Sequence, residues 1–310
     1  MISFTSDDPV PGGIGPSAVA IGKFDGIHVG HRSVLTLLKQ QAAARGLSSV
    51  VVTFDRNPLA IVRPDLCPDP VVSNAQKLEL LDDAGIDATL MLIFDERLAA
   101  EEARPWAERL VQELDVKLLI AGQDFRFGHR AQGNVALLQE LGATFGFEVI
   151  AIDDVAGLGD RRASSTWVRE LLDEGNIPLV TELLGRHPRL RSVVIHGDAR
   201  GREMGFPTTN LDVSRMEGYI PTPGVYACWA TVAGVRHPAA VSIGDNPTFD
   251  DVTELRVEAH LIDGDAGDLY DRVIELEIVD YVRPMYRFDS VEALTVALGN
   301  DVVRVREILS

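Results

Sequence analysis

The sequence predicts an α/β domain followed by a β-barrel domain: a parallel sheet covered by helices, then an antiparallel barrel that ends in a helix. Three observations favour this fold class. Before residue 176, short apolar runs alternate with longer amphipathic runs. After Gly185, short apolar runs are separated by Gly, Pro and Asp, without a helical pattern between them. A helical pattern returns only at 290–309.

The first half contains candidate strands that are short, mostly apolar and rich in β-branched residues or Leu. They span 17–24, 49–54, 88–93, 117–121 and 147–152. Candidate helices lie between them at 31–45, 75–84, 99–114 and 133–141. Strands that are too apolar for one-sided exposure to water indicate a parallel sheet that is buried on both faces.

A helical segment at 164–175 and a short Leu-rich turn that ends at Gly185 join the two halves. We place the domain boundary near 176–188, which gives domains at 1–180 and 186–310. The candidate strands of the second domain span 191–196, 224–232, 237–243, 255–262 and 273–279.

Composition excludes several classes of protein. The 310 residues are 46% hydrophobic and carry a net charge of −18, which argues against nucleic acid and anionic membrane surfaces as partners. No uncharged apolar stretch approaches the roughly 18 residues that a membrane span needs. The start has no signal-peptide pattern, so we expect a cytoplasmic protein. Cys67 and Cys228 form no CxxC motif and predict neither a zinc site nor a disulfide framework.

The first chemical motif is GKFDGIHVGH at 22–31, between a strand and a helix. Its glycines let the backbone approach a ligand, and a helix start favours a phosphate. His28 and His31 are three residues apart, so both imidazoles face the same side of the first turn, where they suit a growing negative charge. The alternatives are a zinc pair, for which further ligands at sensible spacing are missing, or two surface histidines.

Two further segments fit the same site. After a candidate strand, AGQDFRFG at 121–128 places Asp124 and two phenylalanines where open parallel sheets bind ligands, although those rings equally suit a core. The segment at 163–169 opens a helix with three hydroxyl groups, followed by Arg169. A clamp on a triphosphate and a simple N-terminal cap explain this pattern about equally.

The second motif is a basic, Gly-rich stretch that runs into PTTN at 207–210. Five arginines lie between 186 and 202, and the glycines at 197, 201 and 205 suit a loop that wraps a polyphosphate. A solvated charge run is the alternative. Thr208 and Asn210 offer neutral oxygens to Mg²⁺ from one strand face. Glu258 lies on a candidate strand, where an inward orientation would suit a general base for phosphoryl transfer, although by itself it is one of 47 acids and carries almost no signal.

With these motifs, the whole chain resembles the bacterial bifunctional riboflavin kinase/FMN adenylyltransferases, also called FAD synthetases. Its first half resembles the Rossmann-like HxGH nucleotidyltransferases and its second half the riboflavin-kinase barrel. The resemblance implies that riboflavin is phosphorylated to FMN in the second domain. FMN then attacks the α-phosphorus of ATP in the first domain, and pyrophosphate leaves. It implies ATP, riboflavin and FMN as substrates, FAD as product, and Mg²⁺.

The resemblance also assigns residues. In the first domain, His28 and His31 contact the ATP phosphates and stabilise the transition state, and Asp124 lines the pocket. The other residues implied there are Gly22, Phe24, Asp25 and Gly26 for ATP, with Ser165, Thr166 and Arg169 for the leaving pyrophosphate. In the second domain it implies Glu258 as the base, Thr208 and Asn210 for Mg²⁺, and Gly197, Arg200, Gly201, Gly205, Thr208 and Arg283 for ATP or flavin.

The chain departs from the family pattern at two places. The family's TFxPHP is TFDRNP at 53–58, so Asn57 replaces a histidine and Arg56 a proline. Asn57 is able to hydrogen-bond a phosphate but carries no charge, which bears on the efficiency of adenylylation. Arg283 is present, but the acid that the family often places two residues later is Met285.

These observations leave three functional hypotheses. The main one is a bifunctional enzyme that makes FMN and then FAD. The second is a riboflavin kinase whose first domain is weak or repurposed, motivated by Asn57. The third is a flavin-responsive binding or regulatory protein, against which Glu258, Thr208 and Asn210 argue, as does the absence of a basic recognition helix from the sequence. Self-association, relative rates and transfer of FMN between the sites are not determined by the sequence.

Overall fold

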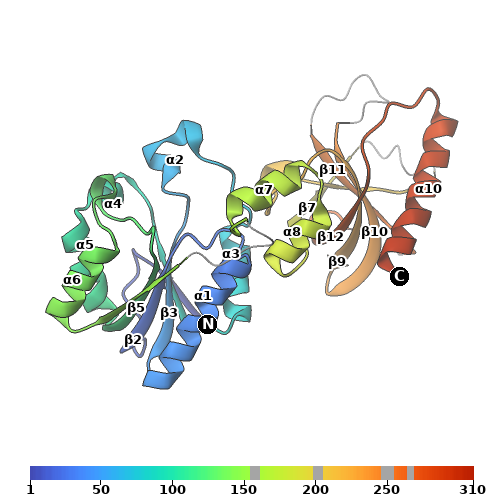
Figure 1. Ribbon diagram of the computed structural model, residues 1–310. Helices are drawn as coiled ribbons and strands as arrows, with labels where there is room; N and C mark the ends of the chain where they lie inside the picture. Colours follow the sequence, from blue (N-terminus) through green and yellow to red (C-terminus); the bar gives the residue numbers. More distant parts are fainter. Residues whose placement is uncertain (154–160, 198–204, 246–254, 264–268) are drawn as a thin grey trace. The chain divides into compact units, whose positions relative to one another are not determined.

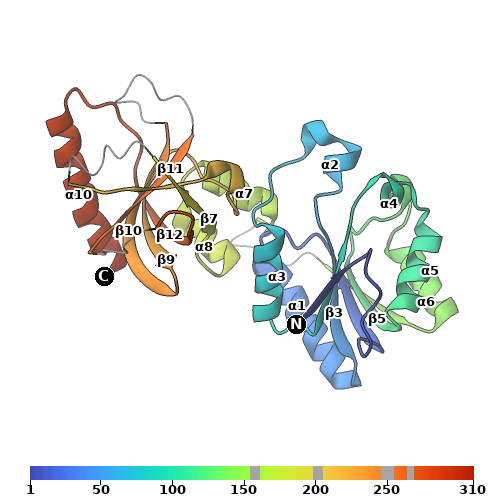
Figure 2. The ribbon, with the colours of Figure 1, turned by 180° about the vertical axis from the view of Figure 1, so that it is seen from behind.

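The computed structural model describes residues 1–153, 161–197, 205–245, 255–263 and 269–310. Contacts divide the chain into two compact units, Met1–Ser164 and Ser165–Ser310 (Figures 1 and 2). Each unit is described below by itself.

The first unit is built on a parallel sheet of six strands in the order β1-β4-β3-β2-β5-β6. The strands are β1 (Ile2–Thr5), β2 (Ser17–Ile21), β3 (Ser48–Phe54), β4 (Ala88–Leu92), β5 (Val116–Gly122) and β6 (Glu148–Ile152). Strands β2, β3 and β4 are buried nearly throughout. This confirms the predicted parallel sheet, because strands covered on both faces need apolar side chains on both.

Helices cover both faces of this sheet (Figure 1). Leu35 and Leu38 of α1 and Leu81 of α3 pack on one face, whereas Trp106 of α5 and Leu138 of α6 belong to the core on the other. The longer helices are α1 (Val29–Arg45), α3 (Asn74–Asp83), α5 (Ala103–Glu113) and α6 (Val135–Phe145). Shorter segments are α2 (Leu59–Val62), η1 (Pro64–Leu66), α4 (Glu96–Ala100) and η2 (His129–Ala131).

The edge strand β1 was not predicted from the sequence. It has four residues, and only Phe4 among them is buried. An edge strand with so few apolar contacts has no periodicity that a sequence window detects. Its position comes from pairing with β4, where Ile2 lies opposite Ala88.

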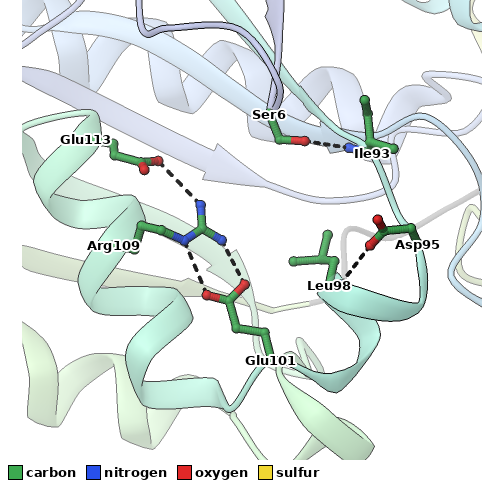
Figure 3. A network of polar contacts seen from close by, with 7 residues as sticks. All are labelled: Ser6, Ile93, Asp95, Leu98, Glu101, Arg109 and Glu113. Atoms are coloured by element: carbon green, nitrogen blue, oxygen red, sulfur yellow. Dashed lines mark hydrogen bonds and ion pairs between the residues drawn. The ribbon is translucent and has the colours of Figure 1, made fainter.

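The helix predicted at 99–114 is interrupted in the structure. Helix α4 ends at Ala100, and α5 begins at Ala103. Pro105 explains the break, because in a continuous helix its ring would clash with the Glu101 carbonyl. That carbonyl instead accepts a hydrogen bond from the His129 N–H at 2.7 Å. The Glu101 carboxylate binds Arg109 through both oxygens, at 3.2 and 2.8 Å, which fixes the bend (Figure 3).

The second unit is a closed antiparallel barrel in the order β10-β11-β8-β7-β12-β9, which confirms the predicted barrel. Its strands are β7 (Arg189–Ile195), β8 (Thr209–Leu211), β9 (Gly224–Val232), β10 (Val235–Gly244), β11 (Arg256–Leu261) and β12 (Val273–Arg283). The helices are α7 (Ser165–Asp173), α8 (Ile177–Leu184), η3 (Val213–Arg215) and α10 (Val291–Leu309). Helix α10 lies outside the barrel (Figure 1). Its Val305 packs against Ala227 of β9.

Helices α7 and α8 belong to the barrel unit. The Thr222 N–H donates to the Leu172 carbonyl at the end of α7, and the Tyr219 hydroxyl donates to Asp173. The segment that the sequence predicted as a Leu-rich turn is helix α8. Asn176 caps its start and Gly185, with φ of 65°, ends it.

We expect Gly218→Ala to destabilise the barrel much more than Gly234→Ala. Both glycines have positive φ, +95° and +81°, so alanine costs about 1 kcal/mol of backbone strain at each position. At Gly218 a Cβ would also lie 2.1 Å from the Arg189 carbonyl oxygen, whereas nothing lies within 4 Å at Gly234. Urea unfolding of the two variants measures the difference. Equal losses would contradict the close approach at Gly218.

Candidate active sites

The first candidate site lies where the strand order of the parallel sheet reverses. From β2 the chain builds outward through β3 and β4, and it then returns to place β5 on the other side of β2. Ligands bind such open sheets at the carboxyl ends of the two strands that flank this switch point. The loops that follow β2 and β5 are the segments at 22–28 and 123–128, which carry the predicted motifs.

The loop after β2 is held in an unusual backbone conformation. Phe24, Gly26 and Ile27 have positive φ values of 47°, 79° and 41°. Two hydrogen bonds to β3 hold the loop. The Gly22 N–H donates to the Val52 carbonyl, and Thr53 Oγ1 donates to the Lys23 carbonyl. Backbone strain of this kind persists only where the surroundings enforce it, and it is concentrated at functional sites.

His28 and His31 are brought together as the sequence predicts. His28 is the N-cap of α1, and its Nδ1 accepts the His31 N–H at 3.4 Å. The two imidazoles stack with ring centroids 3.8 Å apart. Since Nδ1 of His28 accepts a hydrogen bond, the proton of its neutral ring lies on Nε2. The ring pair therefore stands at a helix N-terminus, where unpaired N–H groups and the helix dipole attract anions.

His31 is held neutral. Its pKa lies well below 6.5, first because burial penalises the charged ring and then because a protonated His28, Arg162 and Lys77 would each repel a positive charge on it. Its Nδ1 is buried and makes no hydrogen bond with the described residues. Phe24, predicted to bind ATP, is only 2% exposed and belongs to the core, with its ring 5.2 Å from that of His31. Phe24 thus packs against the His31 ring from the core.

Lys77 is a charged residue of this site that sequence reasoning missed. It lies on α3 and is 6% exposed, and its ammonium group donates to the Phe54 carbonyl at the end of β3 at 2.9 Å. Burial lowers its pKa, and the nearby Asp25 and Asp55 raise it. Asp25 itself accepts the Val71 N–H at 2.8 Å. In the sequence Lys77 lies in a polar stretch of a helix, and only the tertiary fold buries it.

The loop after β5 exposes Asp124 to solvent. Its side chain is 68% exposed and lies 3.3 Å from Arg162. Phe125 and Phe127 stack with ring centroids 5.5 Å apart, and Phe127 also packs against Trp106 of the core. Phe127 is therefore a core residue, which was one of the two interpretations of these rings, whereas Phe125 is only partly buried.

The family departure at Asn57 has a local structural role. Its Oδ1 accepts the Leu59 N–H at 3.2 Å, at the start of the short helix α2. Arg56, the other departure, pairs with Asp55 through Nη2 at 2.7 Å. Asp55 also accepts the Phe94 N–H at 2.8 Å, so it joins the ends of β3 and β4.

Ser165, Thr166 and Arg169 open helix α7. Helix α7 belongs to the second unit, whereas the other residues described for the first site lie in Met1–Ser164. Thr166 is exposed, and Ser165 and Arg169 are partly buried.

The second candidate site lies on the barrel, where three oxygen-bearing side chains meet. Thr208 Oγ1 donates to Glu258 Oε2 at 3.3 Å, and Asn210 of β8 lies directly opposite Glu258 of β11. A Cβ at Gly197 would overlap the Asn210 carboxamide nitrogen at 2.1 Å, so a larger residue there would displace the Asn210 side chain. Gly205, with φ of +82°, turns the chain toward Thr208. Arg200 and Gly201 lie outside the described residues.

Glu258 does not point inward, contrary to the expectation from its strand pattern. Its neighbours Val257 and Ala259 are buried at 1% and 0% exposure and fill the barrel. Side chains alternate along a strand, so Glu258 and His260 face outward. Opposite His260 lies Ala240, which packs in the same cluster as Val305 of α10. The glutamate therefore lies on the outer surface that α10 partly covers.

The oxygens of Thr208, Asn210 and Glu258 fit a Mg²⁺ that also binds phosphate oxygens, because hydroxyl, amide and carboxylate oxygens are the ligands that this ion prefers. A site of this kind needs few protein charges. The described ranges contain no cluster of three or more His, Cys, Asp or Glu side chains suited to a metal ion.

Arg283, at the end of β12, is held by a carboxylate that the sequence motif did not reveal. Its Nε and Nη2 donate to both oxygens of Asp301 on α10, at 2.8 and 2.7 Å. Met285 stands where the family often has an acid. In this chain the carboxylate that pairs with Arg283 comes from Asp301, 18 residues further along. In the sequence Asp301 occupies a polar position of an amphipathic helix, which predicts exposure.

Comparisons with known proteins agree with this architecture. Residues 14–167 match the FAD synthetase family and residues 184–309 match the riboflavin kinase family. In the part of the chain that the structure describes, we find no helix with the length and apolar character of a membrane span.

The bifunctional riboflavin kinase/FMN adenylyltransferase of Escherichia coli K12 is 36% identical over 93% of this chain and 91% of its own length. That of Pseudomonas fluorescens is also 36% identical, over 92% and 91%. A crystal structure titled macrolide-efflux protein from Streptococcus pneumoniae shares the fold, with a TM-score of 0.85, 30% identity and 99% coverage of both chains. This chain belongs to the family of bifunctional riboflavin kinase/FMN adenylyltransferases.

Proposed function

We propose that the barrel unit phosphorylates riboflavin to FMN with ATP and that the sheet unit transfers AMP from a second ATP to FMN, giving FAD and pyrophosphate. The observation that carries the proposal is the stacked His28 and His31 at a helix N-terminus beside the switch point of the sheet. The outer-face cluster of Thr208, Asn210 and Glu258 supports the kinase step.

In adenylyl transfer, a phosphate oxygen of FMN attacks the α-phosphorus of ATP, and the bond from that phosphorus to the bridging oxygen of pyrophosphate breaks. Negative charge grows on the phosphate oxygens. His28, at the N-terminus of α1, meets this charge with its imidazole, and His31 acts as a neutral imidazole. Lys77 holds the end of β3 and adds fixed positive charge nearby. We assign Ser165, Thr166 and Arg169 to the leaving pyrophosphate and Asp124 to the rim of the pocket.

In the kinase step, the Glu258 carboxylate takes the proton of the riboflavin 5′-hydroxyl as the hydroxyl oxygen attacks the γ-phosphorus of ATP, and the bond from that phosphorus to the bridging oxygen breaks, so that ADP leaves. Thr208 orients the carboxylate through the bond to Oε2. Thr208 and Asn210 would hold Mg²⁺, which when bound neutralises charge on the ATP phosphates. Gly197 and Gly205 flank the segment that we assign to the ATP phosphates. Both reactions consume ATP, and we propose the cytoplasm as their compartment.

We expect Glu258→Gln to abolish FMN formation from riboflavin while FAD is still made from added FMN. His31→Asn should have the opposite effect, because FMN accumulates when adenylyl transfer loses its site. Losing an electrostatic group aimed at developing charge costs about 100-fold to 1,000-fold in kcat. Chromatography of flavin products, with riboflavin or FMN supplied together with ATP and Mg²⁺, separates the two activities.

A wild-type chain that forms neither product overturns the proposed function. Accumulation of FMN with little FAD in the wild type supports the second hypothesis, a kinase with a weak first domain. In that case Asn57→His is expected to raise FAD formation.

The protonation of His31 gives a pH prediction. An unfolded histidine binds a proton near pH 6.5, whereas folded His31 has a pKa well below that value. Below about pH 6.5 the unfolded chain therefore binds more protons, and the free energy of unfolding falls as the pH falls, by up to about 1.4 kcal/mol per pH unit. Thermal unfolding of the wild type and His31→Asn at pH 7.5, 6.5 and 5.5 measures this loss.

The wild type should lose more stability than His31→Asn between pH 6.5 and 5.5, since all other groups titrate alike in both chains. Side-chain ¹⁵N spectra should show His31 neutral at pH 6. Parallel stability curves, together with a protonated His31 at that pH, would contradict the assignment.

A further inference from the structure

A buried ion pair joins the C-terminal helix to the end of β12. Asp301 of α10 is 5% exposed, and both of its carboxylate oxygens accept hydrogen bonds from Arg283. The Arg283 side chain is 19% exposed, and its Nη1 donates to the Pro284 carbonyl at 3.0 Å. The rings of Tyr286 and Phe288 lie 5.7 and 5.6 Å from the guanidinium carbon.

Stability alone does not account for this pair. Removing two charges from water is costly, and well-packed apolar residues in their place often give equal or greater stability. Helix α10 already has an apolar anchor, because Val305 is fully buried against the barrel. A bidentate carboxylate adds a geometric constraint, because it fixes the plane and position of a guanidinium group.

Arg283 lies at the same level of the barrel's outer surface as Glu258. Glu258 lies opposite Ser242, Ser242 opposite Val225, and Val225 opposite Arg283. This row crosses four neighbouring strands, so the two ends are at most roughly 14 Å apart at about 4.8 Å per strand.

The strand is also irregular where Arg283 stands. The register of β12 against β9 shifts between Tyr281 and Arg283. A bulge of this kind re-aims the side chain that follows it, and bulges are frequent next to active sites. The bulge and the ion pair thus act together on one guanidinium group.

Arg283 keeps hydrogen-bonding capacity for a ligand. Its guanidinium has five N–H groups, and three of them serve Asp301 and Pro284. Among the described residues, no other group takes the remaining two. A cation that is fixed in this way, beside two aromatic rings and at the same level of the barrel as the proposed catalytic base, suits a flavin substrate with polar ring edges.

We propose that Asp301 is a positioning residue of the kinase site, which holds Arg283 in place to bind the flavin. The proposal rests on the proposed kinase function. It makes α10 part of the substrate site, because the helix carries the carboxylate that orients Arg283.

The chain offers a matched control on the same helix. Arg306 of α10 forms a two-pronged ion pair with Asp263, at the end of β11. This pair is exposed and contains none of the residues assigned to either reaction. Asp263→Asn removes one charge and one anchor of α10, as Asp301→Asn does, but it leaves Arg283 untouched.

The experiment measures initial rates of the full-length chain with riboflavin and with ATP as the varied substrate. Asp301→Asn should raise the KM for riboflavin roughly tenfold, the order expected when a hydrogen bond to a charged group is lost. The KM for ATP should stay within about twofold. FAD formation from added FMN serves as the internal measure of folded enzyme. Asp263→Asn should leave both KM values unchanged.

A double-mutant cycle tests whether Asp301 acts through Arg283. Arg283→Gln should raise the KM for riboflavin, and adding Asp301→Asn to it should change the KM by less than about twofold, because effects that pass through one group do not add. Fully additive effects would overturn the proposal, and so would equal effects of Asp301→Asn on both substrates or an equal effect of Asp263→Asn.

Failure of the proposed function is recognised separately. If the wild type forms no FMN, quenching of riboflavin fluorescence measures flavin binding directly. Weaker binding by Asp301→Asn but not by Asp263→Asn then still supports the positioning role. Equal binding by all three chains overturns it.

Discussion

Both sites must hold polyphosphate anions in a chain whose net charge is −18, and this electrostatic constraint governs their construction. Bulk charge repels the ligands, so attraction has to be local. The first unit meets the constraint with the N-terminus of α1, a strained loop and two stacked imidazoles. The barrel meets it with neutral oxygens from Thr208 and Asn210, which suit a cation that accompanies the ligand. Neither arrangement requires a basic surface, which fits nucleotides as ligands.

Fixed cations are held by partners that keep them in place. Lys77 is anchored by the Phe54 carbonyl and Arg283 by the Asp301 carboxylate. A charge fixed before the ligand arrives needs no reorganisation during the reaction, and it acts more strongly where water is excluded. Burial has a second effect on His31, since the same desolvation that strengthens nearby charges keeps that ring neutral. Placement and protonation of these groups are therefore consequences of packing.

The elements of the fold that follow strong periodicity were predictable, and those set by single contacts were not. The buried strands β2, β3 and β4 show in the sequence because both faces need apolar side chains. Strand β1 depends on pairing with β4, and the break between α4 and α5 depends on Pro105 and on the His129 N–H that takes the Glu101 carbonyl. The inward orientation expected for Glu258 was wrong, because a strand pattern gives alternation but not which face is inside.

The sequence by itself determined the two-part architecture, the motif that pairs His28 with His31, and the presence of Thr208, Asn210 and Glu258. These features are local in the chain or follow from periodicity, so they need no knowledge of distant contacts. Only the tertiary structure decided that Lys77 is buried near His31, that Asp301 pairs with Arg283, and that Glu258 lies on the outer surface of the barrel. The physical reason is that a polar position on a helix predicts exposure to water. Burial instead depends on which element packs against it, and here the partner strands are distant in the sequence.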